Sequence, residues 1–413
     1  MDGRGTGERK GMTDEFDFTS IIERRGKDAI ALDALYGSDY APRIPDGVTD
    51  PIPMWVADMN FAAPACITDA VKERLAHPLF GYFEPRSEYY ESIISWQKNR
   101  HGMMDLKPEQ IGYENGVLGG LVSALRVLCE QGDEVLVHSP TYVGFTSSMT
   151  HAGYRLLLSE LRKDGNGIYR MDFEDMEQKI RSRHVRCAVF CSPHNPAGRV
   201  WERWEIEQAM ELFRRYGVYV ISDEIWEDLV LPGHTHIPTC SVSDDAKERT
   251  VSLYAPTKTF NLAGLIGSYH IIQNPYLRER IEKAGQATHY NSMNVLSMYA
   301  LIGAYSEQGG RWLDRLVRIL ETNLAEGIRF LEKEFPGTAC TRPEGTYMLF
   351  VDFTGYCART GISLDELLGR VWNAGVAIQD GRPFHGVCHS RMNFALPHAR
   401  VLEALERMRK ALP

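Results

Sequence analysis

The sequence predicts an α/β protein with a mostly parallel sheet, because short apolar runs alternate with longer amphipathic stretches. The apolar runs have the length and composition of buried strands, and they cover 134–140, 186–196, 217–224, 250–256 and 267–272. Helical periodicity marks the stretches between them, such as 119–133 and 205–217. Alternation of this kind is typical of parallel sheets whose crossover connections are helices.

A different texture after about residue 310 predicts a second, smaller α+β domain. A long amphipathic helix is expected over 311–335 and a strand over 346–353. The remainder predicts a helix and short strand in 363–381, a strand over 390–396 and a terminal helix. We therefore expect a flexible tail over 1–15, a segment over 16–60 that packs with the small domain, a large domain over 61–310 and a small domain over 311–413.

Composition and charge restrict the classes of partner but say little about small substrates. Of the 413 residues, 44% are hydrophobic and 24% charged, which is ordinary for a globular protein. The net charge of −9 argues against nucleic acid as a partner. The N-terminus lacks the apolar core of a signal peptide, and no apolar run reaches the ~20 residues of a membrane span. We expect no membrane contact and a cytoplasmic location.

The eight cysteines are scattered and form no CxxC pair. For Cys187 and Cys191, which lie in a strand-like run, we expect buried free thiols. So few cysteines in so long a chain do not suggest a disulfide scaffold. This pattern fits a reducing compartment, and no metal site is expected.

Polar or reactive residues follow several of the predicted strands. Tyr142, Asn195, Asp223 and Lys258 each stand at the end of one of these apolar runs or just beyond it. Open α/β sheets bind their ligands outside the carboxyl ends of the strands. We therefore expect these four side chains to converge on one site.

Lys258 lies in the segment YAPTKTFNLAG, among small and apolar neighbours. Desolvation lowers the pKa of a lysine and frees its lone pair, so this residue could form a Schiff base with an aldehyde. Asp223, if buried, requires a cationic partner, and a protonated pyridine nitrogen is one. The alternatives are a loop lysine beside a helix start and, for Asp223, a helix N-cap.

Three more segments offer groups that complement the same ligand. Asn195 provides an amide donor for a phenolate oxygen, and Tyr142 provides a ring face for stacking. In ENGVLGGL, Asn115 can cap a helix and Gly116 lets the backbone approach a phosphate. Aldehyde, pyridinium, phenolate and phosphate together describe pyridoxal 5′-phosphate (PLP). Taken alone each signal is weak, since the segment around Asn195 also suits a plain Pro-Gly turn.

These motifs carry a family resemblance. SPHNPAGRVW, SDEIWEDL and APTKTFNLAGL resemble the signature blocks of fold-type I PLP enzymes, the class I/II aminotransferase superfamily, and the separations of 28 and 35 residues between Asn195, Asp223 and Lys258 match as well. PMWVADMNF and LFGYFEP resemble the cystathionine β-lyase-like branch, the MalY/PatB group of C–S lyases. The resemblance covers about 16–413 and implies a seven-stranded, mostly parallel sheet in the large domain.

The resemblance also implies a role for each matching residue. Lys258 would hold PLP, Asp223 would keep its ring nitrogen protonated, and Arg391 would bind the substrate α-carboxylate. The other implied cofactor contacts are Asn195, Tyr142, Val117, Leu118, Thr257 and Tyr82. Tyr82 would reach the phosphate of a neighbouring subunit and assist Lys258 in catalysis, so a homodimer is expected. Asn195, Trp55, Asn60 and Trp226 would contact the substrate.

Four positions depart from the family pattern. Ala255 stands where serine is frequent, and Ile266 stands where aminotransferases usually carry arginine, so the phosphate has fewer polar partners. Asn60 replaces an aspartate that is common in the lyase branch, and Trp226 replaces histidine or tyrosine. The last two departures leave the identity of the substrate open.

The implied activity is a PLP-dependent β-elimination that releases a thiol, pyruvate and ammonia from a cystathionine-like or S-alkyl-cysteine substrate. Transamination shares the early steps, and no residue in the sequence distinguishes the two reactions. A PLP-binding regulatory protein with weak lyase activity, and β- or γ-chemistry on an unusual amino acid, are further alternatives. His289 and Tyr290 could line the mouth of the site or serve packing alone.

Overall fold

The computed structural model describes residues 15–413, so nearly all of the predicted tail lies outside the described part. Its main feature is a seven-stranded sheet with the strand order β2-β10-β9-β8-β7-β3-β4. Six strands run in one direction and β10 is antiparallel to both of its neighbours. The strands are β2 (Ile111–Glu114), β3 (Glu134–Ser139), β4 (Arg155–Glu160), β7 (Cys187–Cys191), β8 (Tyr219–Asp223), β9 (Thr250–Tyr254) and β10 (Ser268–Ile271). The predicted sheet is confirmed.

Helices cover both faces of this sheet. Successive side chains of a strand point to opposite faces, and apolar side chains on each face pack against helices. Val135 and Val137 of β3 pack with α4 (Val117–Leu128), α5 (Val143–His151) and α10 (Pro275–Thr288). Leu136, between them, packs on the other face with α6 (Phe173–Arg183), α7 (Arg203–Tyr216) and α8 (Asp244–Arg249). This doubly covered sheet leaves its strand ends free for loops that build a site.

A second sheet of five strands has the order β1-β13-β14-β12-β11. The strands are β1 (Ile52–Met54), β11 (Ala339–Cys340), β12 (Met348–Asp352), β13 (Val376–Asp380) and β14 (His389–Asn393). Strand β1 comes from the N-terminal part of the chain and pairs with β13 in parallel. The segment before residue 60 therefore contributes to the sheet of the C-terminal part. A two-stranded hairpin, β5 (Arg162–Lys163) with β6 (Tyr169–Arg170), pairs with neither of these sheets.

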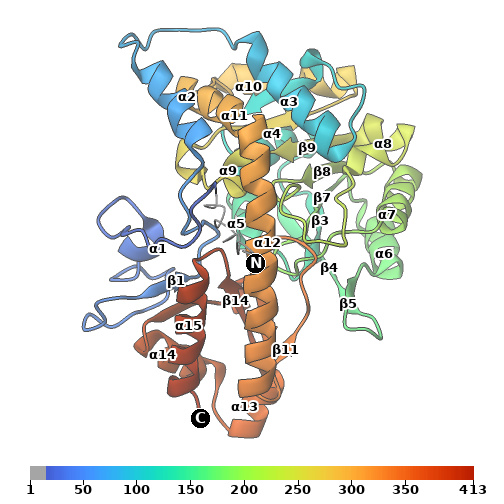
Figure 1. The fold of residues 1–413 in the computed structure, drawn as a ribbon. Coiled ribbons are helices and arrows are strands. Elements are labelled where there is room, and N and C mark those ends of the chain that lie inside the picture. Colours follow the sequence, from blue (N-terminus) through green and yellow to red (C-terminus); the bar gives the residue numbers. More distant parts are fainter. Residues whose placement is uncertain (1–14) are drawn as a thin grey trace, which may run out of the picture.

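The long helix α12 (Glu307–Glu334) runs past both sheets, from the helices around the large sheet to the red C-terminal part (Figure 1). The remaining helices are α1 (Ile30–Asp33), α2 (Ala65–Leu75), α3 (Ser87–His101), α9 (Pro256–Thr259), α11 (Val295–Ala304), α13 (Thr354–Thr360), α14 (Leu364–Asn373) and α15 (His398–Ala411). The domain boundaries at residues 60 and 310 stay predictions.

Two further findings for residues 15–413 concern membrane-spanning helices and the cysteines. None of the helices there is both long and apolar enough to cross a membrane. All eight cysteines belong to this part of the chain and are unpaired.

Candidate active site

A cavity of about 310 Å³ lies at the carboxyl ends of the central strands. Strand β8 ends at Asp223, and the short helix α9 after strand β9 carries Lys258. The predicted residues that line this cavity are Val117, Leu118, Tyr142, Asn195, Asp223, Trp226, Thr257 and Lys258. The structure thus brings together residues that are up to about 140 positions apart, as expected for a parallel sheet.

Lys258 is partly buried, and its amine points to the segment that follows strand β1. The Nζ atom donates a hydrogen bond of 2.7 Å to the carbonyl oxygen of Ala57 and lies 5.8 Å from the ring centroid of Trp226. Burial lowers the pKa of Lys258 to about 8, and the nearby charge of Arg391 acts in the same direction. Asp58 and Asp223 oppose this shift. A sizeable fraction of the amine is therefore neutral near physiological pH and able to act as a nucleophile or base.

Asp223 is 4% exposed, and its Oδ1 atom accepts a 3.0 Å hydrogen bond from the backbone N–H of Ile225. Burial raises the pKa of this carboxyl to about 7. A buried carboxylate is stable when a cation lies beside it. The charge of Lys258 lowers the pKa of Asp223 too little to offset the effect of burial. A protonated pyridine nitrogen bound in this cavity would supply the missing partner, so Asp223 fits PLP.

The N-terminus of helix α4 forms another wall of the cavity. Gly116 precedes the helix with φ of +88°, and no side chain caps the first turn. Val117 and Leu118, the first two residues of the helix, line the same cavity, and the N-terminal end of a helix favours an anion. Tyr290 donates a 3.2 Å hydrogen bond to the Gly116 carbonyl. The Tyr290 hydroxyl also lies so near Gly119 that a Cβ at that position would be only 2.1 Å from it. This end of the cavity fits a phosphate.

A second cavity, of about 500 Å³, adjoins the first and shares Ala57, Tyr142 and Lys258 with it. Trp55 and Arg391 also line this second cavity. It adjoins the amine of Lys258 and is lined by Arg391, the residue predicted to bind the substrate carboxylate.

Arg391 is 4% exposed and is held by three contacts. Its Nη2 donates to the carbonyl of Trp55 at 3.0 Å, and its Nη1 donates to Oδ1 of Asn195 at 3.2 Å. The Cζ atom lies 4.2 Å from the ring centroid of Phe384. The Nε atom has no hydrogen-bond partner within residues 15–413. Burial lowers the pKa of Arg391 to about 10, so the guanidinium stays charged and has donor capacity left for a carboxylate.

Two predicted residues line neither cavity. Tyr82 is fully exposed, on the connection between helices α2 and α3. Asn60 accepts a 3.0 Å hydrogen bond from Nη1 of Arg24 and lines a separate cavity at the N-terminal segment. Trp226, in contrast, is buried in the site, with its ring 4.7 Å from that of Tyr347 in an edge-to-face arrangement.

Three contributors are not assigned by sequence reasoning. The Ala57 carbonyl lies inside the segment PMWVADMNF, but a backbone contact has no residue-type signal. Phe384 lies in an unassigned stretch, and only its proximity to Arg391 reveals it. For Tyr290 the sequence allows either a site role or packing, and its hydroxyl donates to the carbonyl of Gly116, a residue that lines the first cavity.

Comparison with known proteins agrees with this geometry. Residues 50–408 match the model of the family described as "Aminotransferase class I and II". The chain belongs to this family.

Among relatives, cystathionine beta-lyase PatB of Bacillus subtilis is 38% identical over 369 residues, which cover 89% of this chain and 94% of PatB. Protein MalY of Escherichia coli is 31% identical, over 82% of this chain and 84% of MalY. The crystal structure of a PLP-bound C-S lyase from Staphylococcus hominis superposes with a TM-score of 0.86 at 31% identity, covering 96% of this chain and 98% of that one. The predicted family and its MalY/PatB branch are confirmed.

Proposed function

We propose that the protein is a PLP-dependent C–S β-lyase that acts on an amino acid with sulfur bonded to Cβ. The observation that carries the proposal is that two cavities meet at Lys258, one matched to PLP and one lined by Arg391. The similarity to PatB and to the S. hominis lyase supports elimination as the reaction. Thiol, pyruvate and ammonia are the products.

When bound, PLP supplies the electron sink that stabilises a carbanion at Cα of the amino acid. Arg391 binds the α-carboxylate and orients the substrate beside Lys258. The Lys258 amine, with its pKa lowered to about 8, takes the Cα proton as a general base. Asp223 keeps the ring nitrogen protonated, and Asn195 and Tyr142 hold the ring. Val117, Leu118 and Thr257 bind the phosphate, and Trp226 limits the room near the amine.

Several finer assignments belong to the same proposal. Tyr82 would act from a second subunit, which explains its exposure in a single chain, and the active protein would be a homodimer. Trp55 contributes the carbonyl that holds Arg391. Asn60 supports the site indirectly through Arg24. The expected cytoplasmic location fits the free cysteines, since such thiols persist in a reducing compartment.

The test is to mix the PLP-loaded protein with L-cystathionine, and separately with L-cysteine, without any keto acid. Pyruvate formed in step with homocysteine or sulfide supports the lyase. If the cofactor's visible band bleaches, no pyruvate appears and an added α-keto acid restores the band, the protein is an aminotransferase. Lys258→Ala is the control, and turnover by this variant would contradict the assignment of Lys258.

A further inference from the structure

A buried cluster of ionisable side chains lies outside both cavities of the candidate active site. His101 ends helix α3, and Glu227 and Asp228 follow strand β8 by four and five residues. Their side chains are 5%, 3% and 1% exposed, respectively. None of the three has a role in the proposed reaction, so the cluster requires an explanation of its own.

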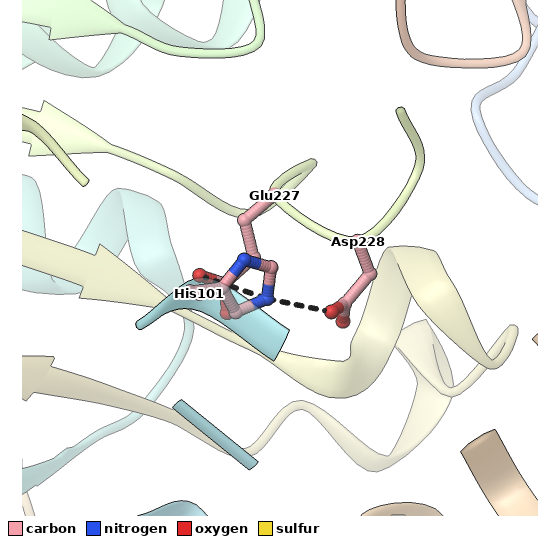
Figure 2. A group of neighbouring side chains, drawn as sticks. All are labelled: His101, Glu227 and Asp228. Carbon is pink, nitrogen blue, oxygen red and sulfur yellow. Dashed lines mark hydrogen bonds and ion pairs between the residues drawn. The ribbon is translucent and has the colours of Figure 1, made fainter. Parts of the chain in front are cut away.

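The three side chains point toward one another (Figure 2). The Nε2 atom of His101 lies 2.9 Å from Oδ1 of Asp228 and 3.5 Å from Oε2 of Glu227. All three ligand atoms lie within 4.8 Å of one another. A metal ion with bonds of about 2.0–2.2 Å to nitrogen and oxygen holds its ligands at such separations.

Several buried polar atoms in this region lack a hydrogen-bond partner, and two of them belong to potential metal ligands. Oε2 of Glu227 and Nδ1 of His236 form no hydrogen bond within the described part of the chain. A buried polar atom without a partner loses its hydration and gains nothing in exchange. For Glu227 the vacant oxygen is the one that faces His101, so a cation at this point would satisfy it.

Other residues fix the remaining oxygens of the two carboxylates. Thr259 donates to Oδ2 of Asp228 at 2.9 Å, and Gln97 donates to Oε1 of Glu227 at 2.7 Å. Trp96 donates to Oδ1 of Asp228 at 3.0 Å, and the second lone pair of that oxygen meets Nε2 of His101 at 2.9 Å, in the contact that a bound cation would replace. Partners of this kind orient metal ligands and are a regular part of metal sites.

The cluster borders a cavity. His101, Glu227, Asp228 and His236 line a cavity of about 590 Å³ that is separate from the two cavities at Lys258. His236 also pairs with Glu224, with 2.8 Å between Nε2 and Oε2, and these two residues and Glu227 form a second, overlapping group of metal-ligating atoms. A cation bound to the first group would therefore lie close to further ligands.

We propose that His101, Glu227 and Asp228 form a binding site for one divalent first-row cation of the Mn²⁺ or Zn²⁺ type. Mn²⁺ and Zn²⁺ accept one imidazole nitrogen together with two carboxylate oxygens, whereas Mg²⁺ and Ca²⁺ prefer ligands that are all oxygen. The ion joins helix α3 to the segment after β8. Through Thr259 it also steadies the turn of Lys258, so its role is positional and it takes no part in the reaction.

The test uses the PLP-loaded full chain, dialysed against a chelator and titrated with Mn²⁺ by calorimetry and by electron paramagnetic resonance. Mn²⁺ is the main probe because it binds thiolates poorly, so the eight cysteines do not compete. We expect one ion per chain and a higher Tm in its presence, since a ligand that binds only the folded state stabilises it.

Two variants and one control decide the outcome. Glu227→Gln and His101→Asn should each lower Mn²⁺ affinity at least ~10-fold and abolish the shift in Tm. Glu321→Gln, which lines the same cavity outside the cluster, should bind as the unmodified protein does. Retained PLP absorbance shows that each variant is folded. The proposal would be overturned if neither Mn²⁺ nor Zn²⁺ bound at one ion per chain. It would also be overturned if both variants bound the metal as tightly as the unmodified protein.

Discussion

Lys258 and Asp223 are the two residues whose protonation the site controls most clearly. Burial moves the pKa of the lysine down to about 8 and that of the aspartate up to about 7. In each case burial disfavours the charged form of the side chain, so ionising either residue in the cofactor-free protein costs free energy. A cationic ring nitrogen beside Asp223 and an aldehyde at Lys258 remove both problems. Cofactor binding should therefore be linked to pH and to stability.

For Asp223→Asn we expect a cofactor-free protein that is more stable than the parent at pH 8, by up to about 4 kcal/mol. A raised carboxyl pKa contributes stability that is present below the unfolded value of about 4 and is lost as pH rises through about 7. The advantage of the variant should therefore disappear near pH 4. Urea denaturation at several pH values measures this, and PLP affinity should fall at least tenfold. A variant less stable at pH 8 would contradict the burial argument.

The rate of PLP uptake by the cofactor-free protein should rise with pH through a midpoint near 8, because only the neutral amine of Lys258 attacks the aldehyde. The charge of Arg391 contributes to the lowered pKa, so Arg391→Gln should move this midpoint upward. Stopped-flow absorbance over pH 6 to 10 provides the measurement. Arg382→Gln, a change at an exposed arginine paired with Asp380, is the matched control and should leave the midpoint in place.

At single positions, sequence reasoning succeeded where a residue follows a strand. Asn195, Asp223 and Lys258 meet because parallel strands end at one edge of a sheet, and this rule needs only the order of elements. It did not place Asn60, whose side chain turns to Arg24, 36 positions earlier. The direction of one side chain in an irregular segment depends on distant partners, and a single sequence does not reveal them.

At the scale of elements, close approach of helices makes two glycines differ in a testable way. Gly303 in helix α11 faces helix α2, where a Cβ would lie 2.5 Å from the carbonyl oxygen of Cys66. Gly303→Ala should destabilise the protein by about 1–3 kcal/mol through overpacking. At Gly369 in helix α14, a Cβ would meet no atom of residues 15–413 within 4 Å, so Gly369→Ala should stabilise by about 0.5–1 kcal/mol. Urea denaturation of the PLP-bound proteins compares the pair, and equal effects would contradict the packing argument.

Elements with strong periodicity were predictable from the sequence. The long amphipathic helix expected at 311–335 appears as α12, and the five predicted strands of the large sheet are all present. The antiparallel course of β10 was not predicted, because apolar content marks a strand without fixing its direction. The pairing of β1 with β13 joins residues over 320 positions apart. For this pairing, the sequence predicted only that the N-terminal segment packs with the C-terminal part.

At the scale of the whole molecule, the position of Tyr82 argues for a second subunit. Leu79, Phe80 and Tyr82 are all exposed in a single chain, on the connection that precedes helix α3. Large exposed apolar side chains that gather on one segment often mark an interface. If Tyr82 completes the site of a partner, each site needs Lys258 from one chain and Tyr82 from the other.

This arrangement predicts complementation between two inactive variants. Lys258→Ala and Tyr82→Phe should each lose most of the lyase activity alone. In a mixed dimer, the chain with Tyr82→Phe keeps its own Lys258 and receives an intact Tyr82 from the Lys258→Ala partner, so one site in two is complete. With random pairing, half of the dimers are mixed, and about a quarter of the parental activity should return.

Co-expression of the two variants with different affinity tags, followed by isolation of the mixed species, makes the measurement quantitative. A purified mixed dimer should have about half of the parental activity, because C2 symmetry gives it one complete site and one that lacks both side chains. Activity no higher than the sum of the single variants would place Tyr82 in its own subunit's site or outside catalysis. Since Tyr82 lines neither cavity of its own chain, that result would require the connection between α2 and α3 to move onto the site.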